Sequence, residues 1–387
     1  MAHIEKRRRK RPDGTYGPVN YRVRWSDPDG DEKSQTFKLG ELEGAKDRMA
    51  EVEHSTRAGT YIDPTAGRET FRDYAEKWRQ VQPHREGTAI NVEQDLRLHL
   101  YPTLGRRPMA AVRQSEVQAL VTKLAQQLAP STVERVRGRV TAVFRAAVRD
   151  RVIAVSPCVD VRVPRSRSSS AVSQVLTTEQ VLELADAMPR RRRSDALGRY
   201  HALVIAGAGL GLRPGELFGL ALDRVDFLRR TVRVDQQLVR YRGRGVHLAD
   251  LKTEASYRTV PLPAVVAEAL AVHLATWLAT NELGLIFTNE RDAPVQQHPF
   301  AMVWATARAA AGLPAWATPH DLRHYFASLL IHAGASVKVV QQRLGHSSAK
   351  VTLDVYAHLW PDDEDRTRQA VDDELGPSRP VSTEMTS

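Results

Sequence analysis

The chain has 387 residues, enough for two or three domains, and 42% of them are hydrophobic, so a folded protein with a sizeable core is expected. Its formal net charge is +10 and its isoelectric point is about 9.8, which favours a polyanionic partner, nucleic acid rather than a membrane surface. Cys158 is the only cysteine, so an intrachain disulfide is excluded and a reducing cytoplasm suits the chain. No apolar run approaches the ~20 residues that span a bilayer, and the charged N-terminus lacks the apolar core of a signal peptide. We therefore expect a cytoplasmic protein with no membrane partner.

Residues 1–62 are predicted to form a small β-sheet with one helix. Tyr21, Val23 and Trp25 alternate with Arg22 and Arg24, the period-two pattern of a half-buried strand. Turn signals flank this strand, and a return strand and a helix follow it. The predicted turns are at Pro12–Gly14 and Asp27–Gly30, the return strand at Gln35–Leu39 and the helix at Glu41–Arg57.

The same segment has a strong local concentration of positive charge. Lys6 to Arg11 is an unbroken run of six basic residues. A sheet with arginines on one face and a helix behind the other can place its strands in a DNA groove. The candidate DNA contacts are Arg7, Arg8, Arg9, Lys10, Arg22 and Arg24. An ordinary small sheet with solvated arginines is the alternative.

Residues 68–157 are predicted to be all helical. Phe71, Tyr74 and Trp78 recur at helical spacing, and aliphatic residues repeat the pattern at 117–124 and 133–148. The last of these helices carries five arginines that either face DNA phosphates or form a solvated face: Arg135, Arg137, Arg139, Arg145 and Arg149. Residues 158–174, which contain Pro164 and a run of Arg and Ser, are predicted to be a linker.

Residues 175–370 are predicted to combine helices with a short sheet. Strands are expected at 231–239, 245–251 and 257–262. Helices are expected at 263–279, 299–311, 320–332 and 336–343. The tail, 371–387, is expected to be flexible because the end of the chain turns acidic and then rich in Pro and Ser.

In this third segment, Arg213 and Arg323 are each three positions away from a side chain that can bind or release a proton. Arg213 directly precedes Pro214, which suits a first helical turn, and Glu216 lies on the same helix face. An arginine at a helix start can bind a phosphate and Glu216 could orient it, although a surface Arg–Glu pair is the alternative. His320 and Arg323 have the same spacing at another helix start, where the helix N-terminus also favours phosphate.

Three further candidate residues are a lysine, a histidine and a tyrosine. Lys252 lies between two predicted strands, in or near a hairpin turn, from where its ammonium could protonate a leaving oxygen. His346 and Tyr356 are ten residues apart, and one straight helix would separate them by ~15 Å, too far to share a phosphate. A turn at Gly345–Ser348 is therefore expected. The other histidines of this region are expected to be structural or exposed: His324 and His332.

Taken in order, these motifs resemble the tyrosine recombinase, or phage integrase, family. The family pattern is Arg, Lys, His-x-x-Arg, His or Trp, then Tyr, and the chain matches it with GLRPGEL, Lys252, HDLRH, LGH and DVYAH. The resemblance makes residues 175–370 the catalytic domain; residues 68–157 look like the core-binding domain, and residues 1–62 like the arm-type DNA-binding domain of phage and integrative-element integrases. The implied fold is multidomain α+β, with a small β-sheet-plus-helix N-terminal domain, an all-α core-binding domain and a mainly α catalytic domain that has a short antiparallel sheet.

The resemblance implies a site-specific DNA recombinase that integrates or excises a mobile element or prophage. Tyr356 would attack the scissile phosphate and form a 3′-phosphotyrosyl link. Arg213 and Arg323 would neutralise the charge that develops on the phosphate, and Lys252 would protonate the leaving 5′-oxygen. This chemistry needs no metal, no other cofactor and no ATP.

The resemblance also assigns roles to the histidines and to partners. His320 would take or give the tyrosine proton, and His346 would hydrogen-bond a phosphate oxygen. The expected partners are double-stranded DNA attachment sites in a bacterial nucleoid and three further copies of the chain, since strand exchange takes a homotetramer on DNA. Residues that follow Tyr356 are candidates for docking onto a neighbouring copy. Accessory proteins that bend DNA or set the direction of reaction are further candidate partners.

Two other functions remain open at this point. A type IB topoisomerase uses nearly the same chemistry on one strand as a monomer, although the two-part DNA-binding N-terminus argues for recombination. A non-enzymatic DNA-binding regulator on the same scaffold should have lost a catalytic group, and none of the family's groups is missing here.

Overall fold

A computed structural model describes residues 2–10, 16–28, 30–63, 65–164, 174–190, 197–241, 245–277, 281–360 and 364–375 of the chain. The chain divides into two compact units, Met1–Arg167 and Ser168–Ser387. None of the described helices is both long enough and apolar enough to cross a membrane.

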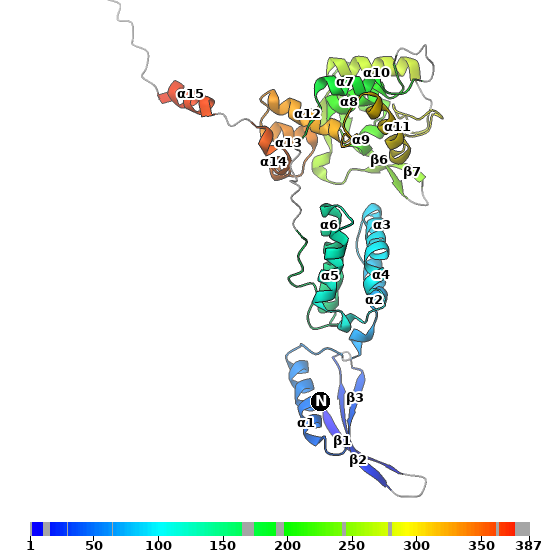
Figure 1. Ribbon diagram of the computed structural model, residues 1–387, viewed down its shortest axis with the longest axis vertical. Coiled ribbons are helices and arrows are strands. Elements are labelled where there is room, and N and C mark those ends of the chain that lie inside the picture. The colour runs from blue at the N-terminus through cyan, green and yellow to red at the C-terminus, as the bar shows by residue number, and fades with distance from the viewer. Residues whose placement is uncertain are drawn as a thin grey trace, which may run out of the picture. The chain divides into compact units, whose positions relative to one another are not determined.

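The first unit begins with a three-stranded antiparallel sheet. Strands β1 (His3–Lys10), β2 (Tyr16–Ser26) and β3 (Glu32–Phe37) follow one another in the sheet, and helix α1 (Leu42–Arg57) lies against it (Figure 1). The basic run was predicted only as a concentration of charge, but most of it forms β1. The predicted turn at Pro12–Gly14 lies outside the described residues, whereas the turn after Asp27 is confirmed by the bond from the Gly30 N–H to the Asp27 carbonyl.

The alternation in β2 decides which face of the sheet is buried. Val23 and Trp25 are buried under α1, and the indole N–H of Trp25 donates to the Tyr61 hydroxyl at 2.7 Å. Arg22 and Arg24, one residue out of phase, therefore lie on the opposite face. The predicted amphipathic strand is confirmed.

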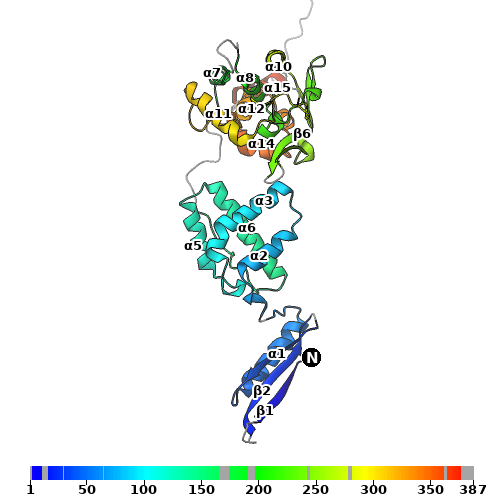
Figure 2. The same cartoon turned by 90° about the vertical axis from the view of Figure 1, so that its right-hand side faces the viewer.

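A helical region follows in the same unit, and its all-helical character is confirmed. Its helices are α2 (Phe71–Gln80), α3 (Glu86–Asp95), α4 (Tyr101–Leu104), α5 (Gln114–Ala125) and α6 (Pro130–Arg149), with a π-helical turn at Leu96–Leu100 and 3₁₀ turns at Ala66–Arg68 and Met109–Ala111 (Figure 2). The aromatic and aliphatic residues named from their spacing form one core. Cys158 and Val161 also pack in this core, so the first residues of the predicted linker belong to the helical region. Residues 165–173 lie outside the described residues.

The arginines of α6 are held by acidic partners to differing degrees. Arg135 and Arg139 both pair with Asp95, whose side chain is only 2% exposed. Arg137 pairs with Glu134 at 2.8 Å. Arg145 and Arg149 are exposed near the C-terminal end of the helix.

The second unit is built around an almost fully buried helix, α8. Eight of the ten residues of α8 are buried, as expected for a helix that is apolar all round. The other helices of this part are α7 (Thr178–Asp186), α9 (Pro214–Phe218), α10 (Ala264–Trp277), α11 (Gln297–Ala310) and α12 (Asp321–His332), while α8 itself spans His201–Leu210. The helices predicted from 263 to 332 are confirmed within a few residues at each end.

The strands of this unit form two small antiparallel sheets rather than one. Strands β4 (Val225–Asp226), β5 (Thr231–Val234) and β8 (Arg258–Pro261) pair in the order β4-β5-β8, and β6 (Gln236–Tyr241) pairs with β7 (Gly245–Asp250). The strand predicted at 231–239 is therefore wrong as a single strand. It breaks at Asp235, whose carboxylate accepts bonds from Arg224 at 2.9 Å and Arg233 at 3.0 Å, and the chain moves from one sheet to the other. Short 3₁₀ turns lie at Leu222–Arg224 and Glu254–Ser256.

The last described helices carry the C-terminal candidate residues. Helices α13 (Val337–Leu344) and α14 (Ala349–Tyr356) pack with α12 around a second, smaller core that contains Phe326, Leu344 and Tyr356. A 3₁₀ turn at Ala357–Leu359 and helix α15 (Glu364–Leu375) follow. The flexible tail predicted at 371–387 is thus helical up to Leu375, and residues 376–387 lie outside the described residues.

Candidate active site

Arg213 is positioned by a sharp transition between two helices. Helix α8 ends at Gly211, which has a left-handed conformation (φ 62°), and Pro214 begins α9 two residues after Leu212. The guanidinium of Arg213 donates to Oε1 of Glu216 at 2.7 Å and to the carbonyl of Gly345 at 2.9 Å. The predicted Arg213–Glu216 contact is therefore present, and it is tied to the loop that contains His346.

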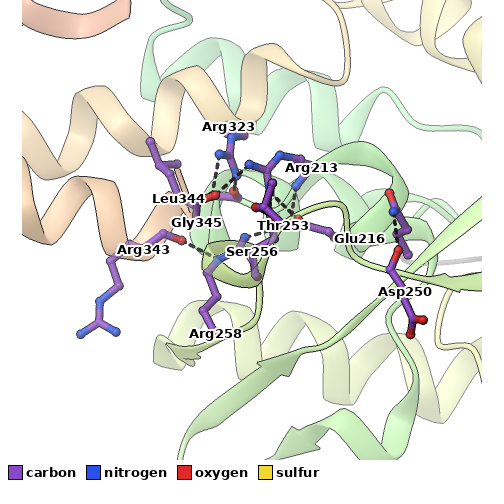
Figure 3. Close-up of polar contacts among 12 residues, drawn as sticks. Arg213, Glu216, Asp250, Thr253, Ser256, Arg258, Arg323, Arg343, Leu344 and Gly345 are labelled. Atoms are coloured by element: carbon purple, nitrogen blue, oxygen red, sulfur yellow. Dashed lines mark hydrogen bonds and ion pairs between the residues drawn. The ribbon is translucent and has the colours of Figure 1, made fainter. Parts of the chain in front are cut away.

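Glu216 is a buried carboxylate shared by two arginines (Figure 3). Its side chain is 2% exposed, and Arg258 of β8 donates to it at 2.8 Å. Burial alone would raise the pKa of Glu216, but Arg258 and Arg213 outweigh burial and lower it below its ordinary value. Arg258 also donates to the carbonyl of Arg343 at 2.8 Å. Sequence reasoning missed Arg258, because a lone arginine in a strand carries no signal of a buried partner far along the chain.

Arg323 joins the same loops from the other helix. Its guanidinium donates to the carbonyls of Gly211 at 2.8 Å and Leu344 at 2.6 Å, and the residue is only 2% exposed (Figure 3). Burial, with repulsion from Arg213, lowers the pKa of Arg323 to about 9, so the side chain remains a cation at neutral pH. Two fixed positive charges therefore lie where the turns after α8 and α13 meet.

Lys252 lies in the connection between the two sheets. It follows β7 and precedes β8, strands of different sheets, so the predicted hairpin position is wrong. Its exposed side chain lines a cleft of about 270 Å³ together with Arg213, Ser256 and His346. The ammonium therefore borders the same cleft as one of the two fixed arginines.

The turn that brings His346 to Tyr356 is confirmed. Helix α13 ends at Gly345 in the left-handed conformation (φ 65°), and Ser348 caps α14 by accepting a bond from the Val351 N–H. The ring of His346 stacks on the ring of Tyr356, with centroids 6.5 Å apart and planes 10° from parallel.

Thr352 fixes which edge of His346 is available to a ligand. The Nδ1 atom of His346 hydrogen-bonds the buried hydroxyl of Thr352 at 2.9 Å. Burial, with repulsion from Arg323 and Arg213, lowers the pKa of His346 to about 3, so its ring is neutral at pH 7. With Nδ1 occupied, Nε2 is the ring nitrogen left for a phosphate oxygen.

Tyr356 is buried and protonated. It is 1% exposed, and burial raises its pKa to about 12 despite the nearby Arg323 cation. Its hydroxyl hydrogen-bonds Nδ1 of His324 at 2.7 Å. His324 was expected to be structural or exposed; it lies one helical turn after His320, and this spacing is the only sequence signal that could have drawn attention to it.

His320 is the residue that directly precedes α12, and its ring lies beside that of His324. The two imidazole rings meet edge to face, with centroids 4.9 Å apart. Burial, with repulsion from His324 and Arg323, lowers the pKa of His320 to about 4, so this ring is also neutral at pH 7. The structure thus places His324 between His320 and the phenol of Tyr356, whose proton His320 was expected to take or give.

The predicted DNA contacts of the N-terminal sheet share a face only in part. The register pairs Arg22 with Glu5 and Arg24 with His3, so alternate positions of β1 and β2, including Arg7, point away from α1. Arg22 donates to Ser34 at 2.7 Å, and Arg24 pairs with Glu32. Arg8 is one residue out of phase with Arg7 and is exposed. Arg9 and Lys10 belong to β1, but their side chains lie outside the described part.

Similarity to known proteins agrees with this fold. The phage integrase family model matches residues 174–362, and the model of the phage integrase central domain matches residues 71–163. The putative prophage phiRv2 integrase of Mycobacterium tuberculosis is 26% identical over 299 residues, which cover 75% of this chain and 76% of that protein.

Two solved structures share the fold. The Tn1549 transposon integrase in complex with transposon right end DNA is 22% identical, with a TM-score of 0.65 over 80% of this chain and 100% of that chain. A lambda integrase tetramer bound to a Holliday junction is 16% identical, with a TM-score of 0.55 over 88% of this chain and 96% of that chain.

A helical domain followed by a mainly helical domain that carries Arg, Lys, His-x-x-Arg, His and Tyr in this order defines a tyrosine-type site-specific DNA recombinase. Both domains match models of one family. The chain belongs to the phage integrase family.

Proposed function

We propose that this recombinase integrates or excises a mobile element or prophage by cutting and rejoining DNA at attachment sites through Tyr356. The observation that carries the proposal is the convergence of distant motifs on one loop. Arg213 binds the Gly345 carbonyl and Arg323 binds the Leu344 carbonyl, next to His346, whose ring stacks on Tyr356.

In the proposed cleavage step, the phenol oxygen of Tyr356 forms a bond to phosphorus as the bond from phosphorus to the 5′-oxygen breaks. The phenol proton passes to an imidazole of the site, and the products are a 3′-phosphotyrosyl link and a free 5′-hydroxyl, whose proton comes from Lys252. The link conserves the energy of the broken ester, so a 5′-hydroxyl can reverse the step without ATP. Lys252 is suited to the acid role because it is an exposed ammonium at the edge of the cleft that Arg213 lines.

The arginines are proposed to stabilise the charge of the transition state. Arg213 and Arg323 are fixed before substrate binds, so little reorganisation is needed as charge grows on the phosphate. Glu216 is proposed to act by positioning Arg213. His346 is proposed to donate from Nε2 to a phosphate oxygen, and His320 to contribute a second neutral imidazole beside His324.

We also propose a function for each part of the chain. Residues 1–62 bind arm-type DNA through the arginine face of β1 and β2, and the helical region from residue 68 binds the core site. That region extends to Val163, whose side chain still packs against its core, and the linker follows it. Residues 175–370 are proposed to cleave DNA, and helix α15 extends past this part to Leu375.

The assembly is proposed to be a homotetramer on two attachment sites, with accessory proteins that bend DNA or set direction, in a bacterial nucleoid. Two features support it: the lambda integrase structure is a tetramer on a Holliday junction, and α15 extends beyond Tyr356 with Val371 and Leu375 exposed. Those apolar side chains are suited to docking on a neighbouring copy. The topoisomerase and regulator alternatives are not favoured, since the chain matches the central domain of integrases and its sequence contains every residue of the family pattern.

The test is covalent capture on DNA. Wild-type protein and Tyr356→Phe are incubated with DNA that carries candidate attachment sites, and complexes that survive denaturant are isolated. The proposal predicts adducts for the wild type and none for the variant, which should still bind DNA. A wild type that relaxes supercoils on DNA without any specific site would point to a topoisomerase.

A further inference from the structure

The hydroxyl of Tyr356 has one hydrogen-bond partner among the described residues, and it is His324. The phenol oxygen lies 2.7 Å from Nδ1 of His324, and the two ring centroids are 5.5 Å apart. His324 is held by α12 and Tyr356 by the last turn of α14, so two packed helices fix this geometry. The group that touches the attacking atom is therefore one that the sequence motif did not assign.

The protonation states of His324 and Tyr356 allow the phenol to donate in this hydrogen bond. Burial lowers the pKa of His324, with Asp321 opposing this shift and Arg323 adding to it. Burial raises the pKa of Tyr356 to about 12. Both groups are neutral at pH 7. In the imidazole tautomer that carries its proton on Nε2, the phenol donates and the Nδ1 lone pair accepts, and this is the tautomer that proton transfer to Nδ1 requires.

We propose that His324 is the base that takes the proton of Tyr356 during attack on the phosphate, an inference that rests on the proposed function. As the bond from the phenol oxygen to phosphorus forms and the bond to the 5′-oxygen breaks, the phenol proton moves to Nδ1. Lys252 supplies the proton of the leaving 5′-hydroxyl. In rejoining, the imidazolium of His324 returns its proton to Tyr356, and Asp321 stabilises that cation in the interval.

The neighbouring imidazoles are less well placed for this transfer. His346 lies parallel to the tyrosine ring, and its Nδ1 bonds Thr352. His320 contacts the ring of His324 edge-on. Neither is bonded to the Tyr356 hydroxyl in the described part of the chain, so a role for His320 in this proton transfer would act through His324.

The first experiment uses full-length protein and a nicked duplex that spans the crossover site to which wild-type adducts map. His324→Asn keeps an amide oxygen near the position of Nδ1, which can accept the hydrogen bond but cannot take the proton. Adduct formation in a single turnover should slow by about 10²- to 10⁴-fold, the usual contribution of general acid–base catalysis. His332→Asn is the matched control, since His332 lies on the same helix and bonds Ser328, and it should cleave at the wild-type rate. A wild-type rate for His324→Asn would overturn the proposal and leave a positioning role.

The second experiment separates proton transfer from structure. Replacing Tyr356 with 3,5-difluorotyrosine makes the phenol more acidic, so attack depends less on a base. Most of the loss in His324→Asn should then be recovered, whereas a variant that is slow because its site is distorted should stay slow. Absence of recovery contradicts the proposal, and recovery seen for His320→Asn but not for His324→Asn moves the role to His320.

A third measurement needs neither DNA nor a variant's activity. Nitrogen NMR of ¹⁵N-histidine-labelled free protein should show His324 as a neutral ring protonated on Nε2, with its signals assigned by their loss in His324→Asn. A ring protonated on Nδ1 would contradict the proposal whatever the activity of the variant. Failure of the proposed function looks different, because wild-type protein would then form no adduct that depends on Tyr356.

Discussion

Glu216 is the carboxylate that pairs with both Arg213 and Arg258, and its replacement measures how much these ion pairs contribute to stability. Glu216→Gln leaves Arg258 buried without a charged partner, so the free energy of unfolding should fall by about 3 kcal/mol, as for other broken buried ion pairs. Denaturant unfolding at pH 7 measures this change. Glu43→Gln is the control; its pair with Lys46 is exposed, so the change should be near zero.

The pH dependence of that difference follows from the lowered pKa of Glu216. A carboxylate whose pKa is lower in the folded state contributes stability above its unfolded pKa of about 4.3 and loses it as the pH falls through the folded pKa. The gap in stability between wild type and Glu216→Gln should therefore narrow below about pH 4. A gap that widens in acid would show that the carboxylate is not stabilised by the arginines.

Lys252 can be tested by changing the leaving group. Lys252→Ala should slow cleavage by about 10²- to 10⁴-fold if the ammonium is the general acid. A substrate with sulfur at the 5′-bridging position has a leaving group that needs no proton, so Lys252→Ala should cleave it at nearly the wild-type rate. Lys350→Ala, an exposed lysine on α14, serves as the control. If sulfur gives no rescue, Lys252 is a phosphate or base contact.

Residue types and order identified the principal groups of the site from sequence, but their partners could not be predicted. Arg213, Lys252, Arg323, His346 and Tyr356 follow a motif that can be read along the chain. The bonds that position them are set by tertiary packing. Examples are Arg258 on Glu216 and His324 on Tyr356, where each pair joins elements that are far apart in sequence.

At the scale of elements, the turn at Gly345 leaves little room for an added methyl group. Gly345 has φ 65°, and an added Cβ would lie 3.0 Å from the carbonyl oxygen of Ala255. Gly345→Ala should lower the thermal midpoint and reduce adduct formation, because the loop that carries His346 must shift. Gly284→Ala is the control for the conformation alone, since its φ is 60° and open space surrounds it. Equal effects in both variants would remove the steric argument.

Periodicity predicted the helices well and the strands less well. Amphipathic helices such as α6 show their buried face in the sequence. The strand predicted at 231–239 shows one continuous pattern, but the chain changes sheets at Asp235, where the carboxylate pairs with Arg224 and Arg233, a tertiary arrangement that the pattern does not contain. β1 was missed because its charged residues mask the alternation, and pairing with β2 makes it a strand.

At the scale of the whole molecule, deletion of residues 1–62 should separate two activities. The remaining domains should still cleave a short core site and form the Tyr356 adduct. Integration between two attachment sites should be lost, and each lost phosphate contact should reduce the log–log salt dependence of binding by about 0.9. Recombination at the full rate by the truncated protein would contradict the arm-binding assignment.

Domain order could be predicted because the hydrophobic period changes from two to 3.6 between the first and second segments. The end of the helical region could not, because Cys158 and Val161 sit in a polar, proline-containing stretch and join the core only through tertiary contacts.

The central claim is that Tyr356 becomes joined to DNA. The most direct measurement is mass spectrometry of the covalent complex after digestion with nuclease and protease, in buffer that contains EDTA. The account predicts a nucleotide attached to the peptide that contains Tyr356, at the same yield with and without the chelator, because arginines rather than a metal neutralise the phosphate. A nucleotide on another residue, or loss of the adduct in EDTA, would contradict it.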